Sequence, residues 1–506
     1  MVLGIDLGTC NSVAATLTRD GSAVLIPDSV NREEVTTPSV AIIDGKKAYA
    51  GLFAENLFET FPDKELISFF KRYFGTQEPV YVDENKNAWF SETLAALILR
   101  KIKYDAEMYM PDGYRKAVIT VPAHYNDAQR KSAIEASRLA GLELNALVEE
   151  PVAAALFYSS QNAKLDDEII LVYDFGGGTF DLTLITKSGN QLHVIAKDGI
   201  SNVGGKEFDE IVSNRIRQTY EDIMKQPFPS DKLSLNRLRK ISEVIKIRLN
   251  QQEGGQDLAQ WLIFGHHAFE CVFDFRAYAS EAVALIQKTE NAVLRCLKSL
   301  GMQWSDVSKV ILIGGTSNSK LIYNYWNQKI NPEKQTLIYH QPLTSVAKGA
   351  AIYAGSLSDG AQQIGSAVEL KTVSTYNIGL RQKGGKQIDL LIHRNTPLPI
   401  SAKRVYRIDP NVHEHFSMDL CQFWDAETEV FYLGEIKAGP FSHQATEFYL
   451  EFAIENRSNG TIGIKVKNAD NGKDIKFEFI KKQTKHTYDF HKQKALVDSV
   501  YLNNYV

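Results

Sequence analysis

A short motif, an aspartate followed by a glycine turn, occurs twice in the chain and restricts the folds open to it. The first copy, Gly4–Ser12, reads Gly-Ile-Asp-Leu-Gly-Thr-Cys-Asn-Ser, and the second, Val172–Asp181, reads Val-Tyr-Asp-Phe-Gly-Gly-Gly-Thr-Phe-Asp. In both copies an apolar segment precedes the aspartate, and alternating residues follow the threonine. This pattern predicts two β-hairpins, each with a glycine turn at its tip.

The residue types in these turns suit phosphate binding. Glycine permits a tight turn and lets backbone N–H groups approach an anion. The aspartate at the strand end, Asp6 or Asp174, can hold a hydrated Mg²⁺, and the hydroxyl of Thr9 or Thr179 can face phosphate. Neither copy has the Gly-Lys-Ser/Thr of a P-loop, and neither opens a helix as a dinucleotide-binding fingerprint does.

A single glycine-rich hairpin would carry little functional information, because short glycine motifs often occur by chance. Two copies with matching Asp and Thr residues, each opening a half of alternating strands and helices, predict a duplicated α/β domain with nucleotide between its halves. This plan resembles the superfamily of actin, sugar kinases and heat-shock ATPases.

Composition excludes several other classes of function. The chain has 506 residues and a net charge of −4, so neither nucleic acid nor an anionic membrane is expected as the main partner. No apolar run has the length of a membrane span, and the first strand begins too early for a signal peptide. Cys10, Cys271, Cys296 and Cys421 lack metal-binding spacing, which predicts free thiols in the cytoplasm.

Hydrophobic periodicity divides the chain into an α/β part and a β part. Helical spacing predicts helices at 51–74, 91–102, 126–141, 149–156, 232–250, 277–300 and 345–354. The residues around 356–366 are rich in Ser, Asp, Gly and Gln, as in a linker. The apolar period then changes to two, which predicts an antiparallel β domain. We therefore expect an α/β domain at 1–356, a linker at 357–372, an antiparallel β domain at 373–482 and a C-terminal segment at 483–506.

Signature segments along nearly the whole chain resemble the seventy-kilodalton heat-shock chaperone family of DnaK-like proteins. These segments are Gly4–Ser12, Val121–Arg130, Glu150–Leu156, Val172–Leu182, Gly204–Asp209 and Val310–Gly315. Arg394–Pro399 is also similar to the start of the family's peptide-binding β domain. The resemblance implies a two-lobed, actin-like ATPase followed by a β-sandwich that binds extended apolar segments of client polypeptides.

The resemblance also implies roles for individual residues in hydrolysis of ATP to ADP with Mg²⁺. The catalytic set would be Lys71, Glu150, Asp174, Thr179 and Asp181. Asp6 and Asp174 would hold Mg²⁺ through water. The phosphate-binding set would be Gly8, Thr9, Cys10, Asn11, Gly176, Gly177, Gly178, Gly204 and Gly205. The adenosine-binding set would be Glu243, Lys246, Asn250, Gly314, Gly315 and Asn318.

Several positions depart from the family pattern on the nucleotide side. Asn318 occupies the place of an Arg that stacks on adenine, and Asn250 that of a Ser that faces the purine. Ile247 replaces a neighbouring Arg, and Lys206 replaces an acidic residue after the glycine pair. These changes predict altered nucleotide affinity more than altered chemistry.

The regulatory surfaces depart further. Ala146 stands where the family has an Arg that engages J-domain co-chaperones. The linker, a run of leucines and an Asp in the family, reads Ala-Val-Glu-Leu-Lys at 367–371. Because Glu369 and Lys371 replace apolar contacts, we expect weak docking of the linker and weak coupling of the two domains. We expect no helical lid in the sequence given, because no long helical pattern follows the β domain, and J-domain proteins and nucleotide exchange factors are the partners that the family implies.

Two alternatives remain open from the sequence. A divergent relative could bind nucleotide as a structural ligand and use its β domain for one dedicated partner; the linker changes favour this, whereas the intact Lys71 and Glu150 oppose it. A small-molecule kinase of the same superfamily would share the repeated turns, but it would not need a β domain after the linker.

Overall fold

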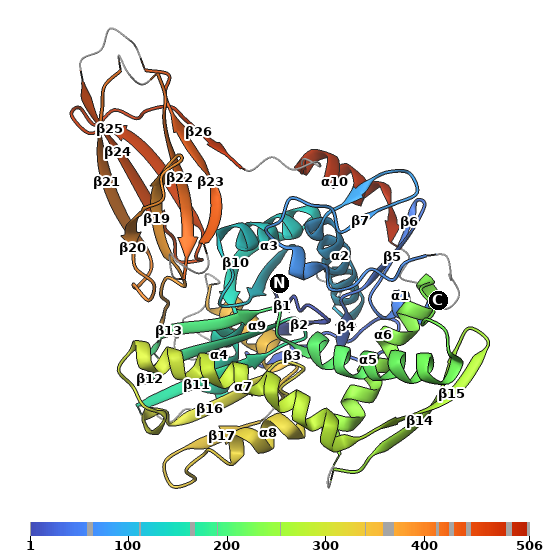
Figure 1. Ribbon diagram of the computed structural model, residues 1–506. Coiled ribbons are helices and arrows are strands. Elements are labelled where there is room, and N and C mark those ends of the chain that lie inside the picture. The colour runs from blue at the N-terminus through green and yellow to red at the C-terminus, as the bar shows by residue number, and fades with distance from the viewer. Residues whose placement is uncertain are drawn as a thin grey trace.

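The computed structural model is a mixed α/β molecule in which a β unit stands on a larger body of helices and strands (Figure 1). The structure describes residues 2–57, 64–110, 113–161, 167–189, 191–252, 255–339, 341–357, 369–410, 414–424, 430–441, 447–481 and 488–502. The body holds two six-stranded sheets, and the β unit is built from two smaller sheets.

The first six-stranded sheet has the order β10-β9-β1-β2-β3, with β4 paired to β2. Strand β1 runs parallel to β9, β9 runs parallel to β10, and β1 and β2 form an antiparallel hairpin. The bounds are β1 (Val2–Asp6), β2 (Asn11–Leu17), β3 (Ala23–Leu25), β4 (Thr36–Pro38), β9 (Lys116–Val121) and β10 (Glu143–Glu149).

The second six-stranded sheet has the order β17-β16-β11-β12-β13-β18. Strand β11 runs parallel to β16, β16 runs parallel to β17, and β11 and β12 form an antiparallel hairpin. The bounds are β11 (Glu168–Phe175), β12 (Thr179–Ser188), β13 (Gln191–Ser201), β16 (Lys309–Ile313), β17 (Thr336–Ile338) and β18 (Glu369–Lys371). The first five strands repeat the topology of the first sheet, so the repeated sequence motif corresponds to a repeated hairpin.

Two helices with small residues, α4 (Glu150–Gln161) and α9 (Ser345–Ser356), join the two sheets through one shared apolar core. Glycine permits this close approach. A Cβ atom on Gly349 of α9 would lie 1.7 Å from the carbonyl oxygen of Ala153 of α4, and one on Gly4 of β1 would lie 2.1 Å from the nitrogen of Ala351. The halves are therefore held together by backbone contact between α4, α9 and the central strands.

The remaining helices of the body pack against the other faces of the sheets. Apolar side chains of α2 and α3 share a core with β1 and β9, and those of α5, α6 and α7 share a core with β11 and β12. The bounds are α2 (Ser91–Tyr109), α3 (Asp127–Leu139), α5 (Gly205–Met224), α6 (Lys232–Gln251), α7 (Phe275–Ser299) and α8 (Lys320–Asn327). The smaller elements are β5 (Ala41–Asp44), β6 (Lys47–Ala50), α1 (Leu52–Leu57), the 3₁₀ helix η1 (Phe70–Tyr73), β7 (Tyr81–Val82), β8 (Ala88–Trp89), β14 (Leu258–Phe264), β15 (His267–Phe273) and the 3₁₀ helix η2 (Trp304–Asp306).

The expected helix at 51–74 is wrong over its second half. Residues 58–63 lie outside the described residues, and residues 64–69 form no helix. Ile67 instead exchanges backbone hydrogen bonds with Ala41, and Phe69 adopts a left-handed backbone with φ 56°. The apolar spacing there reflects burial in the core rather than a helical face, because Leu66, Ile67 and Phe70 are all buried.

The β unit is a sandwich of a five-stranded sheet, β20-β19-β22-β23-β26, and a three-stranded sheet, β21-β24-β25. One apolar core includes residues of both sheets. The turn expected at 468–472 is present, but β26 pairs with β23 in the other sheet rather than with β25. The bounds are β19 (Asn377–Gln382), β20 (Ile388–Ile392), β21 (Ile400–Ile408), β22 (Phe416–Phe423), β23 (Val430–Ala438), β24 (Phe448–Asn456), β25 (Ile462–Asn468) and β26 (Phe477–Ile480).

The end of the linker is docked on the second sheet, and the expectation that this docking is weak stays a prediction. Residues 358–368, which include Ala367 and Val368, lie outside the described residues. The end of the linker forms β18, which extends the second sheet by parallel pairing of Leu370 with Leu192 and of Lys371 with His193 of β13. Backbone N–H and C=O groups make this pairing, so a change of side-chain polarity does not prevent it.

The C-terminal segment returns to the body after the sandwich. Helix α10 (Phe490–Ser499) lies beside α2 and α3, and strand β27 (Tyr501–Leu502) pairs with β6 (Figure 1). Val497 and Val500 are buried there, and the hydroxyl of Thr93 donates to Gln493 Oε1 at 2.7 Å. The sandwich is thus attached to the body at both ends, by β18 before it and by α10 after it.

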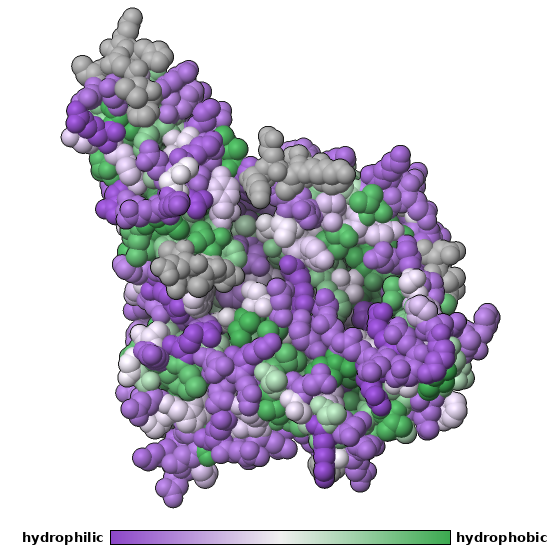
Figure 2. All heavy atoms as spheres, viewed as in Figure 1, coloured by the Kyte–Doolittle hydropathy of each residue, from purple (hydrophilic) through white to green (hydrophobic). Residues whose placement is uncertain are grey.

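No helix in the described part of the chain combines the length and the apolar character needed to cross a membrane. Figure 2 shows hydrophilic residues over most of the visible face, with hydrophobic residues in scattered patches. The large apolar side chains gather instead in the cores described above.

Candidate functional site

The two repeated turns face one another and are in contact. Gly8, Thr9 and Cys10 lie between β1 and β2, Asn11 begins β2, and Gly176–Gly178 connect β11 to β12. A Cβ atom on Gly177 would lie 2.2 Å from Cys10 Sγ, and one on Gly178 would lie 2.8 Å from Thr9 Cγ2. Glycine is therefore required by close approach of the two turns.

A third glycine pair packs on the second turn. The N–H of Gly205 donates to the carbonyl of Gly176 at 3.0 Å, and the N–H of Lys206 donates to that of Gly177 at 2.9 Å. Gly204 is the N-cap of α5, so this helix begins beside the turn. The phosphate-binding residues inferred from the sequence thus come together at one place between the two sheets.

Lys71 and Glu150 form a buried ion pair next to these turns. Lys71 lies on η1, and its ammonium donates to Glu150 Oε1 at 2.9 Å and to the carbonyl of Leu7. Burial acts to lower the pKa of Lys71, but the charge and hydrogen bond of Glu150, together with Tyr125 and Asp6, outweigh it and the pKa is raised. Lys71 therefore stays an ammonium ion in the site.

Three carboxylates surround this lysine. Asp6 ends β1 and accepts a hydrogen bond from the hydroxyl of Thr120 at 2.9 Å, and Asp174 lies one residue before the end of β11. Burial raises the pKa of Asp6 and that of Asp174, where Glu150 adds repulsion. Burial also raises the pKa of Glu150 to about 7, against the attraction of Lys71. The site therefore has more buried negative charge than its one lysine neutralises.

Asp181 has a partner that the sequence analysis missed. His124, in the segment after β9, donates its backbone N–H to Asp181 Oδ1 at 2.9 Å, and its ring Nδ1 lies 2.6 Å from the same oxygen. Burial acts to lower the pKa of His124, but Asp181 outweighs it and the pKa is raised. Thr179 begins β12, two residues before Asp181. The signal for His124 was its place in the segment that follows the buried strand β9.

Arg72 is a second residue that the sequence analysis missed. It follows Lys71 but points to the other half of the body, where Nη1 and Nη2 donate to the two carboxylate oxygens of Glu207 on α5 at 3.0 and 3.1 Å. Nη2 also donates to the carbonyl of Gly178 at 2.9 Å. The two-pronged contact joins the two halves across the site.

The residues inferred to bind adenosine lie on α6 and after β16. Lys246 does not pair with Glu243; its ammonium lies 2.9 Å from Asp209 Oδ1 of α5. Thr316 follows the pair Gly314 and Gly315, and its hydroxyl donates to the carbonyl of Gly176 at 2.8 Å. This contact links the loop after β16 to the second glycine turn.

A hollow of about 200 Å³ lies between the first turn and α6. Thr9, Cys10 and Glu243 line it. Val244 and Ile247 line it as well, although the sequence did not predict a contact with nucleotide for either residue. The other residues inferred to bind adenosine do not line this hollow. These are Lys246, Asn250, Gly314, Gly315 and Asn318.

Asn250 and Asn318 are each held by a tyrosine. The hydroxyl of Tyr278 donates to Asn250 Oδ1 at 2.9 Å, and Asn250 is buried. The hydroxyl of Tyr339 donates to Asn318 Oδ1. Both amides therefore have a fixed direction, which a sequence alone does not reveal.

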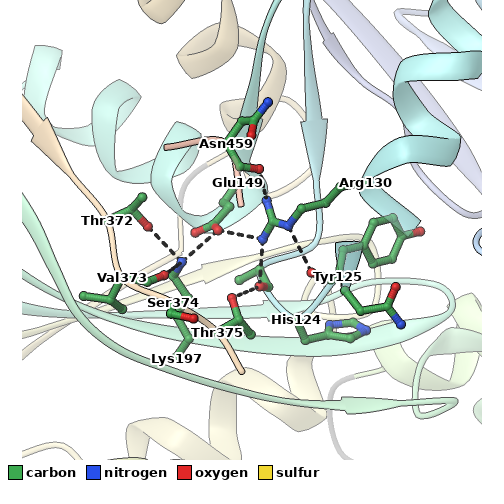
Figure 3. Close-up of polar contacts among 12 residues, drawn as sticks. His124, Tyr125, Arg130, Glu149, Lys197, Thr372, Val373, Ser374, Thr375 and Asn459 are labelled. Carbon is green, nitrogen blue, oxygen red and sulfur yellow. Dashed lines mark hydrogen bonds and ion pairs between the residues drawn. The ribbon is translucent and has the colours of Figure 1, made fainter. Parts of the chain in front are cut away.

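A buried charge network connects the site to the linker and the sandwich (Figure 3). Glu149, next to Glu150, accepts from Arg130 Nη2 and from Lys197 Nζ, each at 2.8 Å. Lys197 Nζ also donates to the hydroxyl of Thr372 and to the carbonyl of Val373, each at 2.8 Å. The residues just after β18 are therefore bound by a lysine of the second sheet.

Comparison with known proteins agrees with this geometry. A family model described as Hsp70 protein matches residues 2–430. A chaperone protein DnaK from Thermosipho melanesiensis is 32% identical over 411 residues, which cover 80% of this chain and 67% of that protein. The chain therefore belongs to the Hsp70 family, whose members are ATP-dependent chaperones with ATPase activity.

The carboxylate surplus fits a bound Mg²⁺. Asp6, Asp174 and Glu150 are buried and interact electrostatically with one another and with Lys71, and their raised pKa values indicate that a further cation would be favourable there. The described residues contain no group of three or more His, Cys, Asp or Glu side chains arranged to bind a metal directly. Mg²⁺ commonly keeps several of its waters and takes one or two carboxylates.

Proposed function

We propose that the chain binds ATP between the two glycine turns, hydrolyses it to ADP and phosphate, and binds extended apolar peptide on its sandwich. The observation that carries the ATPase proposal is the meeting of Lys71, Glu150, Asp6 and Asp174 beside the contact between the turns. These residues come from η1, α4, β1 and β11, so only the folded chain assembles them.

Each residue of the proposed site has a role that its geometry supports. Lys71 brings a permanent positive charge to the place where charge grows on phosphate oxygens. Glu150, with its raised pKa, can accept a hydrogen bond from the attacking water, and Asp181 is oriented by His124. Thr9 and Thr179 offer hydroxyls to the phosphates. Hydrolysis of this kind depends mainly on positioning and on neutralisation of charge.

When bound, Mg²⁺ neutralises charge on the phosphates, and Asp6 and Asp174 would hold it through water. On the base side, we propose that Glu243, Lys246, Asn250, Gly314, Gly315 and Asn318 surround the adenosine. Val244 and Ile247, exposed on α6, add an apolar wall beside Glu243.

We further propose the domain division of an actin-like, two-lobed ATPase at 1–356, a linker at 357–372, a sandwich at 373–482 and a C-terminal segment at 483–506. The repeated sheet topology and the separate core of the sandwich support this division. We also propose that the chain acts on client polypeptides in the cytoplasm, with J-domain proteins and nucleotide exchange factors as partners.

A second candidate is a binding module that holds one dedicated partner and couples ATP to peptide only weakly. The attachment of the sandwich at both ends favours it, because β18 and α10 both oppose a large movement of the sandwich.

Two measurements test these functions on the full chain. Single-turnover hydrolysis of radiolabelled ATP should show release of phosphate; no release above the spontaneous rate would leave only the binding module. Stopped-flow release of a fluorescent apolar peptide should then be faster with ATP than with ADP for a coupled chaperone. If the peptide is released at the same rate with ATP and with ADP while ATP is hydrolysed, the chain is an ATPase whose nucleotide state is not coupled to peptide binding.

A further inference from the structure

A second and larger hollow lies at the junction of the body and the sandwich. Its volume is about 1250 Å³, and its walls come from α7, from the end of β13 and from the sandwich. Pockets for small molecules usually measure about 300–1,000 Å³. We call this hollow the junction pocket; it is separate from the hollow at the glycine turns, and it has room for several residues of a polypeptide.

Cationic side chains dominate the walls of the junction pocket. Lys288, Arg295 and Lys298 lie along one side of α7 at spacings of seven and three residues, which places them on the same helix face. Asp198 is the one carboxylate among the lining residues, and Arg295 Nη2 lies 2.9 Å from it. Among the described residues, no carboxylate pairs with Lys288 or Lys298. The pocket is therefore positive in a chain whose net charge is −4.

The sandwich adds a fourth cation from the opposite wall. The guanidinium of Arg394 lies 4.1 Å from the ring centroid of Trp424, and Nη2 donates to the carbonyl of Lys197 at 3.2 Å. Arg394 Nε is buried and has no hydrogen-bond partner among the described residues. A donor left unpaired in this way costs free energy that an anionic acceptor would recover.

We propose that the junction pocket binds an acidic segment of a partner polypeptide, with carboxylates that bridge the α7 cations and Arg394. Charge complementarity selects this occupant, because the two walls carry like charges and an anion between them replaces repulsion with attraction. The same segment would contact the body and the sandwich at once. It would therefore stabilise the docked arrangement, independently of whether the chain hydrolyses ATP.

The test uses a fluorescein-labelled octapeptide of alternating Glu and Ala and its neutral Gln-Ala counterpart. Fluorescence anisotropy should show that the full chain binds the Glu peptide at least about tenfold more tightly than the Gln peptide, and that salt weakens the binding because exposed charges are screened. The double variant Lys288→Glu/Lys298→Glu should lose at least about tenfold in affinity. These lysines form no ion pair with the described residues, and an unchanged thermal midpoint would show that the variant folds.

The matched control is Lys232→Glu/Lys334→Glu, two exposed lysines that do not line the pocket. It changes the net charge equally and should leave binding within about twofold. Equal losses in the two double variants would overturn the proposal, because the peptide would then respond only to overall charge. Displacement of the Glu peptide by an apolar client peptide would also overturn it, since the binding would then belong to the sandwich. Arg394→Gln, which removes the positive charge but keeps a polar side chain, should weaken binding of the Glu peptide and leave binding of the Gln peptide unchanged.

Discussion

The ammonium of Lys71 lies 2.9 Å from the carboxylate of Glu150, although 79 positions separate the two residues in the chain. The pair brings η1 and α4 together beside the glycine turns. It also affects the charge of the site. Burial raises the pKa of Glu150 and Lys71 opposes this rise, while Glu150 in turn raises the pKa of Lys71.

Lys71→Ala should reduce single-turnover ATP hydrolysis by at least about a hundredfold while ATP binding changes only a few-fold. The reason is that a preorganised charge acts mainly on the transition state, where such a group is typically worth that much. Lys64→Ala is a matched control, because Lys64 forms ion pairs with Asp44 and Glu84 outside the site. If Lys71→Ala hydrolyses ATP at the wild-type rate, the assignment of Lys71 to the catalytic site is wrong.

Glu150→Gln should change how the stability of the nucleotide-free protein depends on pH. The pKa of Glu150 is raised from 4.5 to about 7, so the folded state holds a proton that the unfolded state loses between these values. Glu150 therefore lowers stability progressively as pH rises from 4.5 to 7, and its full cost is present above pH 7.

The Gln variant lacks this titration. Its thermal midpoint should rise relative to wild type as pH increases across this window and then stay level. A difference between the two proteins that is constant from pH 4.5 to 8 would show that Glu150 titrates normally in the folded chain.

Arg72→Ala should speed release of bound nucleotide by about tenfold or more, equal to about 1.4 kcal/mol. Arg72 joins the two halves through Glu207 and the carbonyl of Gly178, and its removal allows them to separate. A double-mutant cycle with Glu207→Gln should give a coupling energy of about 0.5–3 kcal/mol. Arg72→Lys should release nucleotide almost as fast as Arg72→Ala, because lysine cannot make the two-pronged contact with a carboxylate. Additive effects of the two changes would argue against the clamp.

Lys197→Met should increase hydrogen exchange at the amides of β18 by at least about tenfold. The ammonium of Lys197 holds Thr372 and Val373 just after this strand, and local opening becomes easier when these bonds are lost. Adding Glu149→Gln should recover part of the protection, because the double change removes a buried carboxylate that the single change leaves without one of its partners. Native exchange in Lys197→Met would mean that strand pairing alone holds the linker.

Val497→Asp should release the C-terminal segment from the body. Val497 of α10 is fully buried in the apolar core that α2 and α3 share with β1 and β9. An unpaired charge is costly there. Hydrogen exchange should increase over residues 490–502. Ala495→Asp places the same charge on the exposed side of α10 and should leave exchange unchanged. Equal effects of the two variants would show that α10 is held by something other than its buried face.

Much of the fold follows from local sequence patterns. The Asp and Gly residues of the repeated motif predicted two hairpins, and the structure contains them as β1–β2 and β11–β12. Apolar spacing located α6, α7 and α9 to within a few residues, because a helix or strand face repeats along the chain. Spacing misled at 64–69, where burial of Leu66 and Ile67 in the core produces the same pattern without a helix.

The sequence by itself determined the two turns, the change from helical to alternating spacing, and the residue types that phosphate requires. Only the tertiary structure decided that Arg72 contacts Glu207, that His124 contacts Asp181, and that β18 joins the second sheet. The first group depends on backbone preferences and periodic burial, which neighbouring residues express. The second depends on how distant segments pack, and strand pairing in particular uses N–H and C=O groups that nearly all residues share. For that reason the polar side chains of the linker did not reveal that its end docks as a strand.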